Sequence, residues 1–244
     1  MHPEHLTEAK RRIVFPLDVP DAGQGMAFVD LLGADVGIFK IGLELFLGEG
    51  PRLVQDIVRR GFRVFLDLKL HDIPKTVERA VRRVADLGAD WITVHSGEST
   101  AMLEAAVIGA GGRVRVLAVT VLTSVSQADL AACGYDPALS VADVVDRKAR
   151  MAIAAGCAGV VCSGHEVSRI KSGIGANVVT FTPGIRPLTE NERPDDQKRV
   201  MTPAAAIRAG ADYLVIGRPI RDAADPVGAA KRIAEEMAGA LTSL

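Results

Sequence analysis

The whole chain alternates between short apolar runs and segments with helical spacing, and this alternation restricts the possible folds more than any other feature. The apolar runs are expected to be strands buried on both faces: residues 12–19, 37–42, a run that begins at 64, 91–96, 114–124, 159–163, 177–182 and 213–216. The helical segments are residues 22–32, 51–60, 75–87, 99–110, 127–133, 141–155, 166–171, 203–209 and 227–240. Roughly eight strand–helix repeats predict an α/β protein, a single (β/α)₈ TIM barrel over residues 1–244.

An open, doubly wound sheet is the competing fold for such an alternation. That fold usually carries a G-x-G-x-x-G fingerprint directly after its first strand. Residues 17–25 read L-D-V-P-D-A-G-Q-G and do not supply it. No linker or low-complexity segment divides the chain, so the closed barrel is favoured and a single domain is expected.

Composition and charge exclude several classes of function. The chain has 48% hydrophobic and 24% charged residues with a net charge of −1, so no nucleic-acid or membrane partner is indicated. No apolar stretch approaches the length of a membrane span, and no signal peptide is recognisable. The three cysteines, Cys133, Cys157 and Cys162, form no C-x-x-C pair and are interpreted as reduced core thiols of a cytoplasmic protein.

Residues 64–76, V-F-L-D-L-K-L-H-D-I-P-K-T, place charges where an apolar strand should not carry them. In a regular strand, Asp67 and Lys69 share one face and the neighbouring leucines take the other. Asp72 follows just beyond the strand end, and Pro74 fits the first turn of a helix. Buried charge is unfavourable unless paired, so a structural ion pair is one interpretation. Three charges within six residues at a strand–helix junction favour a functional site.

Further polar residues collect at the carboxyl ends of the predicted strands, which is where a barrel of this type has its active site. Lys40 lies inside the apolar run G-I-F-K-I-G, and packing alone does not explain a lysine there. Asp18 ends the first strand, although an aspartate before a proline-containing turn is also ordinary turn chemistry. His95 ends the fourth strand and is as often a structural residue. Thr120 and Thr123 end the fifth strand.

Two similar elements, T-P-G-I-R-P and V-I-G-R-P-I, follow the seventh and eighth strands. Loops at these two places frequently bind phosphate in this architecture. Gly217 lets backbone N–H groups approach an anion, and Arg186 and Arg218 offer planar donors for phosphate oxygens. The alternative is that each arginine merely caps a strand end. Their coincidence at both expected places favours a phosphate ligand.

With these motifs the sequence resembles a known family, the orotidine 5′-phosphate decarboxylases. D-L-K-L-H-D-I-P-K-T is similar to their D-x-K-x-x-D-I-P-x-T signature, and the resemblance continues in P-L-D-V-P-D, F-K-I-G, V-T-V-L-T-S, T-P-G-I-R-P, R-V-M-T-P-A-A-A and Y-L-V-I-G-R-P-I. It is closest to the bacterial, single-function branch. Two departures concern local loop shape: Lys75 stands where asparagine is common, and S-G-E-S follows His95.

The resemblance implies cofactor-independent decarboxylation of orotidine 5′-phosphate to UMP, the last step of de novo pyrimidine synthesis, with no metal. It implies that Lys69 donates a proton to C6 of the pyrimidine, with Asp67 next to the departing carboxylate. Lys40 and Asp72 complete the charged array. In a homodimer, Asp72 and Thr76 are expected to reach the neighbouring subunit's site.

The resemblance also implies which residues bind the substrate. Asp18 and Lys40 are expected at the ribose hydroxyls and Thr123 at the pyrimidine. At the phosphate, the expected residues are Arg186, Gln197, Gly217 and Arg218, with Gln197 on a closing loop.

Two other functions stay open from the sequence. One is a Mg²⁺-dependent sugar-phosphate enzyme of the same barrel type, similar to hexulose-phosphate synthase, which keeps the D-x-K-x-x-D triad. It is not expected to carry the I-P-x-T and T-P-G-I-R-P matches, and full activity in EDTA would discriminate against it. The other is an inactive barrel that binds a nucleotide as a regulator; the intact triad argues against it, and a turnover assay decides.

Overall fold

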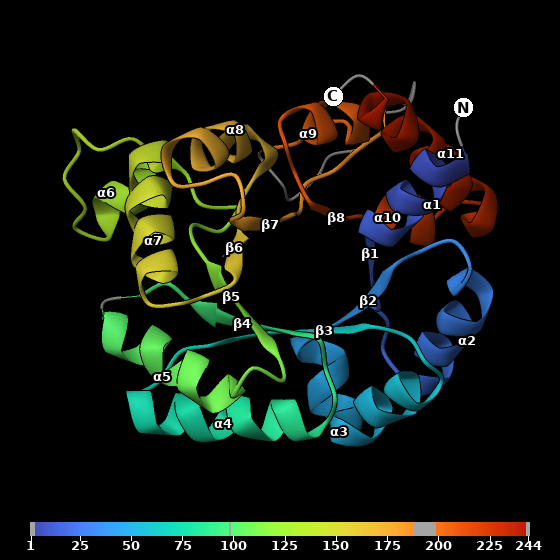
Figure 1. Cartoon of the computed structure of the whole chain (residues 1–244), viewed down its shortest axis with the longest axis horizontal. Coiled ribbons are helices and arrows are strands. Elements are labelled where there is room, and N and C mark those ends of the chain that lie inside the picture. Colours follow the sequence, from blue (N-terminus) through green and yellow to red (C-terminus); the bar gives the residue numbers. More distant parts are fainter. Residues whose placement is uncertain (1–2, 98, 188–198, 243–244) are drawn as a thin grey trace.

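A computed structural model describes residues 3–97, 99–187 and 199–242. Eight parallel strands pair in sequence order and close into a barrel, with helices around the outside (Figure 1). The strands are β1 (Ile13–Pro16), β2 (Ile38–Gly42), β3 (Val64–Leu70), β4 (Trp91–His95), β5 (Arg115–Val119), β6 (Gly159–Val161), β7 (Val179–Thr182) and β8 (Tyr213–Val215). The predicted (β/α)₈ barrel is confirmed.

Two packed clusters explain why the strands read as continuous apolar runs. Val14, Ile38, Phe65 and Trp91 belong to a cluster formed by alternate strand residues, whereas Phe15, the neighbour of Val14, belongs to the larger core shared with the helices. Successive side chains of a strand point to opposite faces, so each strand supplies both clusters. Burial on both faces leaves little room for polar residues within the strands.

The helices are α1 (Pro3–Arg12), α2 (Ala22–Leu32), α3 (Leu43–Arg59), α4 (Pro74–Asp86), α5 (Thr100–Ala110), α6 (Gln127–Ala132), α7 (Val141–Ala154), α8 (Gly164–Gly173), α9 (Pro203–Arg208), α10 (Arg218–Arg221) and α11 (Pro226–Leu241). Side-chain caps define several starts; Ser140 and Asp143, for example, form a reciprocal capping box at α7. Helix α1 was not predicted, and it packs beside α11 (Figure 1).

Several element boundaries differ from the sequence predictions, and three of them affect the site. Helical structure before β3 begins at Leu43, eight residues ahead of the predicted start, with a break at Gly50, whose φ is +67°. Glycine tolerates this left-handed conformation, and Pro51 then starts the second part of the helix. Strand β1 ends at Pro16 and β5 at Val119, so the polar residues predicted at their ends lie in the loops at the barrel mouth.

None of the helices within the described residues is long and apolar enough to span a membrane. The three cysteines are not in disulfides, but the prediction of three core thiols is wrong for one of them. Cys157 and Cys162 are buried, whereas Cys133 is exposed at the end of α6. That helix has six residues and buries only Leu130, so Cys133, which follows its last residue as the C-cap, stays outside the core.

Candidate active site

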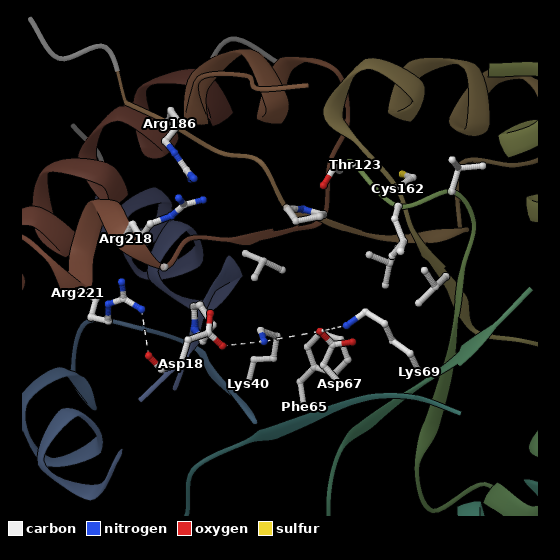
Figure 2. A pocket seen from close by; sticks show the side chains of 18 residues that line it. Asp18, Lys40, Phe65, Asp67, Lys69, Thr123, Cys162, Arg186, Arg218 and Arg221 are labelled. Atoms are coloured by element: carbon white, nitrogen blue, oxygen red, sulfur yellow. Dashed lines mark hydrogen bonds and ion pairs between the residues drawn. The ribbon is translucent and has the colours of Figure 1, made fainter. Parts of the chain in front are cut away.

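A cavity of about 320 Å³ opens at the carboxyl ends of the strands. Its lining includes eight of the residues predicted from the sequence: Asp18, Lys40, Asp67, Lys69, Thr123, Arg186, Gly217 and Arg218. Figure 2 shows the labelled side chains converging on this cavity from different strands and loops. Apolar residues such as Phe65, Val119, Val161 and Val215 complete the lining. The structure thus gathers most of the predicted site, although those residues span two hundred positions of the sequence.

Four charged side chains of alternating sign form a row along one side of the cavity. Lys40 Nζ lies 3.3 Å from Asp18 Oδ1 and 3.6 Å from Asp67 Oδ2, and Lys69 Nζ lies 2.9 Å from Asp67 Oδ2. Two strands, β2 and β3, and the loop after β1 supply them, and Figure 2 shows the row with Lys69 at one end. Alternation of sign lets neighbouring groups compensate one another where burial alone would be unfavourable.

The Asp67 carboxylate is the centre of this row, and only 14% of its side chain is exposed. Burial opposes ionisation of the carboxyl. The ammonium groups of Lys40 and Lys69 and hydrogen bonds from Lys69 and Thr93 outweigh that effect, so the pKa of Asp67 lies below its ordinary value. Asp67 is therefore an ionised carboxylate near neutral pH, held between two cations.

An irregularity of β3, not plain alternation, brings Asp67 and Lys69 together. Leu66 pairs with Ile92 and Leu70 with Val94, so three residues of β3 lie opposite one residue of β4. Within this bulge Lys69 has a φ of +48°, the single positive φ of a non-glycine residue in the described chain. Such conformations are unfavourable for side-chain-bearing residues and cluster at functional sites. The predicted proximity is confirmed, but the predicted regular strand is not.

Arg186 and Arg218 lie on the other side of the cavity from Lys69 (Figure 2). Arg186 follows β7, and Arg218 begins α10 directly after Gly217. A Cβ atom on residue 217 would lie 2.8 Å from Pro16 Cγ, so this turn requires glycine. The two guanidinium groups give this side of the cavity a positive character suited to an anion.

Arg221 was missed by the sequence analysis although it also lines the cavity. Its guanidinium donates a 3.0 Å hydrogen bond to the Asp18 carbonyl oxygen (Figure 2), and it also pairs with Asp222. It thereby connects α10 to the loop that carries Asp18. Arg218 and Arg221 are three residues apart, so they lie on the same side of a helix. Prediction of a helix after β8 would therefore have indicated that Arg221 lies near Arg218.

Thr93 is the second residue beside the charged row that the sequence analysis missed. Its side chain is fully buried in β4. The hydroxyl donates to Asp67 Oδ1 and accepts from the Lys69 backbone N–H, both at 2.9 Å. A threonine inside the apolar run W-I-T-V-H gives little signal by itself, because threonine is common in strands.

Asp72 and Thr76 do not line the cavity of their own chain. Both are exposed, in the turn after β3 and the first turn of α4. The Asp72 carboxylate accepts a 2.6 Å hydrogen bond from the Ile73 backbone N–H. Gln197 lies outside the described residues.

His95, Thr120 and Cys162 have more local roles. His95 is half-buried, its ring centroid lies 6.0 Å from that of His71, and burial is the main reason why its pKa is lowered. The Thr120 hydroxyl donates to the Val161 carbonyl oxygen. Burial raises the pKa of the Cys162 thiol, so this cavity-lining cysteine is not a ready nucleophile.

The described residues contain no group of three or more histidine, cysteine, aspartate and glutamate side chains arranged to hold a metal ion. The side chains of the cavity present a cation beside a carboxylate at one end, where Lys69 meets Asp67, and two arginines at the other. Such a site can bind an elongated anionic molecule and supply a proton at the end remote from the arginines.

Comparisons with known proteins agree with this geometry. The sequence profile of the family described as "Orotidine 5'-phosphate decarboxylase / HUMPS family" matches residues 11–233. The orotidine 5′-phosphate decarboxylase of Anaeromyxobacter sp. (strain K) is 49% identical over 91% of this chain and 96% of its own length. That of Desulfosudis oleivorans is 47% identical over 95% of each. The crystal structure of the Lactobacillus acidophilus enzyme of that name is 33% identical, with a TM-score of 0.81 over 93% of this chain and 99% of that one.

Proposed function

The chain belongs to the orotidine 5′-phosphate decarboxylase / HUMPS family, and we propose that it converts orotidine 5′-phosphate to UMP and CO₂ without a metal or organic cofactor. This is the last step of de novo pyrimidine synthesis. The observation that carries the proposal is the charged row, which ends in Lys69 on the side of the cavity away from the arginines. Orotidine 5′-phosphate, an aromatic acid with a remote phosphate, matches this separation of Lys69 from the arginines.

Lys69 is the proton donor in this proposal. The bond between C6 and the carboxylate breaks and leaves its electron pair on C6, while CO₂ departs. The ammonium group of Lys69 stabilises the developing negative charge and transfers a proton to C6. The resulting amine regains its proton from solvent. Asp67 keeps the Lys69 ammonium beside the reacting carbon, since their charged atoms are 2.9 Å apart.

The phosphate is placed at Arg186 and Arg218, with Gly217 allowing close approach of the backbone. The ribose is placed between the two ends, at Asp18 and Lys40, which are themselves paired. Thr123 lies on the cavity wall, where the pyrimidine is expected. Binding energy from the remote phosphate can help offset the desolvation of the charged row when substrate enters.

A homodimer with shared sites is part of the proposal, with Asp72 and Thr76 reaching the neighbouring subunit. Two features support it: neither residue lines the cavity of its own chain, and the side chain of Ile73, which lies between them, is 67% exposed and would be covered by an interface there. Asp72 then completes the charged array of the neighbouring site. The enzyme is expected to act in the cytoplasm as a single-domain chain.

Mixing of inactive variants tests the shared site. Lys69→Ala and Asp72→Ala are each expected to be nearly inactive, and random exchange makes about half of the dimers mixed, with one intact site each, so about a quarter of all sites recover. The measurement is activity after joint unfolding and refolding, with mixed dimers verified by mass spectrometry of a tagged subunit. Mixed dimers without recovered activity would show that Asp72 serves its own subunit.

The proposed reaction is tested by following the loss of orotidine 5′-phosphate by its ultraviolet absorbance, with EDTA present. Turnover in chelator supports the cofactor-independent decarboxylase. Activity restored only by Mg²⁺, together with turnover of a hexulose phosphate, would support the sugar-phosphate enzyme instead. Binding of UMP without turnover of either substrate would indicate a nucleotide-binding regulator.

A further inference from the structure

The bulge in β3 lies directly opposite a single buried residue of β4. Between the pairs Leu66–Ile92 and Leu70–Val94, strand β3 has three residues and β4 has only Thr93. A regular ladder cannot satisfy the backbone of such an insertion, so side chains must supply partners. The Lys69 N–H, which belongs to the inserted segment, donates to the Thr93 hydroxyl at 2.9 Å.

We propose that Thr93 is a positioning residue that holds the bulge so that Asp67 and Lys69 face the substrate together; this inference rests on the proposed decarboxylase function. The hydroxyl of a threonine has one donor hydrogen and two acceptor lone pairs. Thr93 uses its donor on Asp67 Oδ1 and an acceptor on the Lys69 N–H. One buried group therefore connects the carboxylate to the backbone of the proton donor.

The two oxygens of Asp67 have separate partners. Oδ1 accepts from Thr93, while Oδ2 lies 2.9 Å from Lys69 Nζ and 3.6 Å from Lys40 Nζ. The hydrogen bond from Thr93 fixes the rotation of the carboxylate about its own axis. Without it, Oδ1 could turn toward either ammonium group, and the distance from Asp67 to Lys69 would no longer be set by the protein. Small displacements of a proton donor can cause large losses of rate.

The backbone conformation of Lys69 gives a second reason why the hydrogen bond to Thr93 is needed. Its φ of +48° lies in the left-handed region, which is unfavourable for a residue with a Cβ atom. The hydrogen bond to Thr93 stabilises this conformation. Because Thr93 is completely buried, bulk water cannot easily replace its hydroxyl. Loss of the hydroxyl is therefore expected to relax the bulge and move the Lys69 side chain relative to C6.

Three variants separate this role from general packing. Thr93→Val keeps the shape and removes the hydroxyl, whereas Thr93→Ser keeps the hydroxyl. Thr182→Val is the matched control, because Thr182 is also fully buried in a barrel strand, and its hydroxyl has no hydrogen-bond partner in the described structure. Each protein is assayed for kcat and KM with orotidine 5′-phosphate, for UMP affinity by calorimetry, and for thermal unfolding.

Thr93→Val is expected to lower kcat about 10- to 100-fold, the loss typical of a displaced catalytic group, while KM and UMP affinity change less than about threefold. Thr93→Ser is expected to recover most of kcat, and Thr182→Val to behave as the wild type. If Thr93→Val does not fold, Thr93→Ala, which lacks the hydroxyl without adding a methyl group in its place, is compared with Thr93→Ser in the same way.

A Thr93→Val enzyme with wild-type kcat would overturn the proposal. So would a variant whose kcat, UMP affinity and thermal stability all fall together and are not recovered in Thr93→Ser, because that pattern describes a packing residue. A wild-type protein that does not turn over orotidine 5′-phosphate refutes the proposed function and this inference with it. An active wild type with an unimpaired Thr93→Val protein refutes the inference alone.

Discussion

The two ends of the barrel each contain a threonine, an aspartate and a lysine in contact, yet the two clusters differ in what the lysine binds. At the carboxyl ends of the strands, Thr93 and Lys69 contact Asp67. At the amino ends, Thr180 donates to Asp212 through both its hydroxyl and its backbone N–H. Lys171 Nζ lies 2.7 Å from the same Asp212 oxygen.

The difference lies in the remaining hydrogens of each ammonium group, which has three to donate. Lys171 donates to the Ala176 and Val178 carbonyl oxygens as well as to Asp212, so its three donors are occupied. In the described structure, Asp67 is the single hydrogen-bond partner of the Lys69 ammonium, and that group faces a cavity. The same three residue types therefore give an ammonium group with all its donors in use at one end, Lys171, and one with spare donors at the other, Lys69.

Residue identity alone therefore does not distinguish a structural ion pair from a catalytic one. A lysine whose three donors are all in use stabilises the loops that it connects and has no donor available for a ligand. A lysine with free donors at a cavity can bind or protonate what enters. Substitutions at each end test whether this difference between the two lysines holds.

The largest expected effect is the loss of catalysis when Lys69, at the carboxyl ends of the strands, is substituted. Lys69→Ala is expected to lower kcat at least ~100-fold, the minimum contribution of a positioned general acid, while UMP still binds. Orotidine 5′-phosphate turnover and UMP calorimetry measure the two properties. A variant that keeps more than about a tenth of kcat would exclude Lys69 as the proton donor, because the loss of rate would be smaller than a positioned general acid contributes.

Arg218→Ala tests the opposite side of the same cavity. Hydrogen bonds to charged groups contribute about 1.5–3 kcal/mol, so kcat/KM for the nucleotide is expected to fall about 10- to 100-fold. Activity on the phosphate-free nucleoside should stay almost unchanged, because in the proposed function Arg218 contacts the phosphate and no other part of the substrate. Steady-state kinetics on both substrates provide the measurement. An equal loss on both would place Arg218 at the reacting centre or in the fold.

Lys171→Ala is the matched substitution at the amino ends of the strands. It leaves Asp212 and two carbonyl oxygens without their lysine partner, so the free energy of unfolding is expected to fall by about 1–3 kcal/mol. The kcat of the folded protein should not change. Urea denaturation and kinetics below the transition measure the two quantities. Loss of kcat without loss of stability would contradict the structural role assigned to Lys171.

The smallest effect concerns acid stability. The pKa of Asp67 in the folded protein lies below its ordinary value of 3.8, so its ionised form stabilises the fold above that pH. This contribution is lost as the pH falls below about 4 and through the lowered pKa of the folded state. The free energy of unfolding of wild type should therefore decline more steeply with acid than that of Asp67→Asn. Parallel urea titrations at several pH values test this, and equal slopes would contradict it.

Several features of the site could be predicted because their signals are local. Lys40 is conspicuous in an apolar strand, and Asp67, Lys69 and Asp72 stand within six residues of one another. Arg186 and Arg218 occupy similar short motifs at two defined places in the strand order. Their gathering around one cavity followed from the rule that parallel strands of a barrel present their carboxyl ends on one face.

Other features have no local signal. Helix α1 buries only Ala9 fully, so its sequence carries too weak an apolar pattern to be recognised. Arg221 reaches the cavity only because a helical turn follows β8, and it then binds the carbonyl oxygen of a residue two hundred positions earlier. Both depend on neighbours that are remote in the sequence.

The sequence by itself determined the barrel, the order of its strands and the charged residues at its mouth, because hydrophobic periodicity and misplaced charges are properties of short segments. Only the tertiary structure decided how Lys69 is presented. Its bulged, left-handed backbone is stabilised by Thr93 on the adjacent strand, 24 residues away. It likewise decided that Lys171 is saturated and Lys69 is not, because the number of acceptors around an ammonium group depends on which distant backbone atoms the fold brings to it.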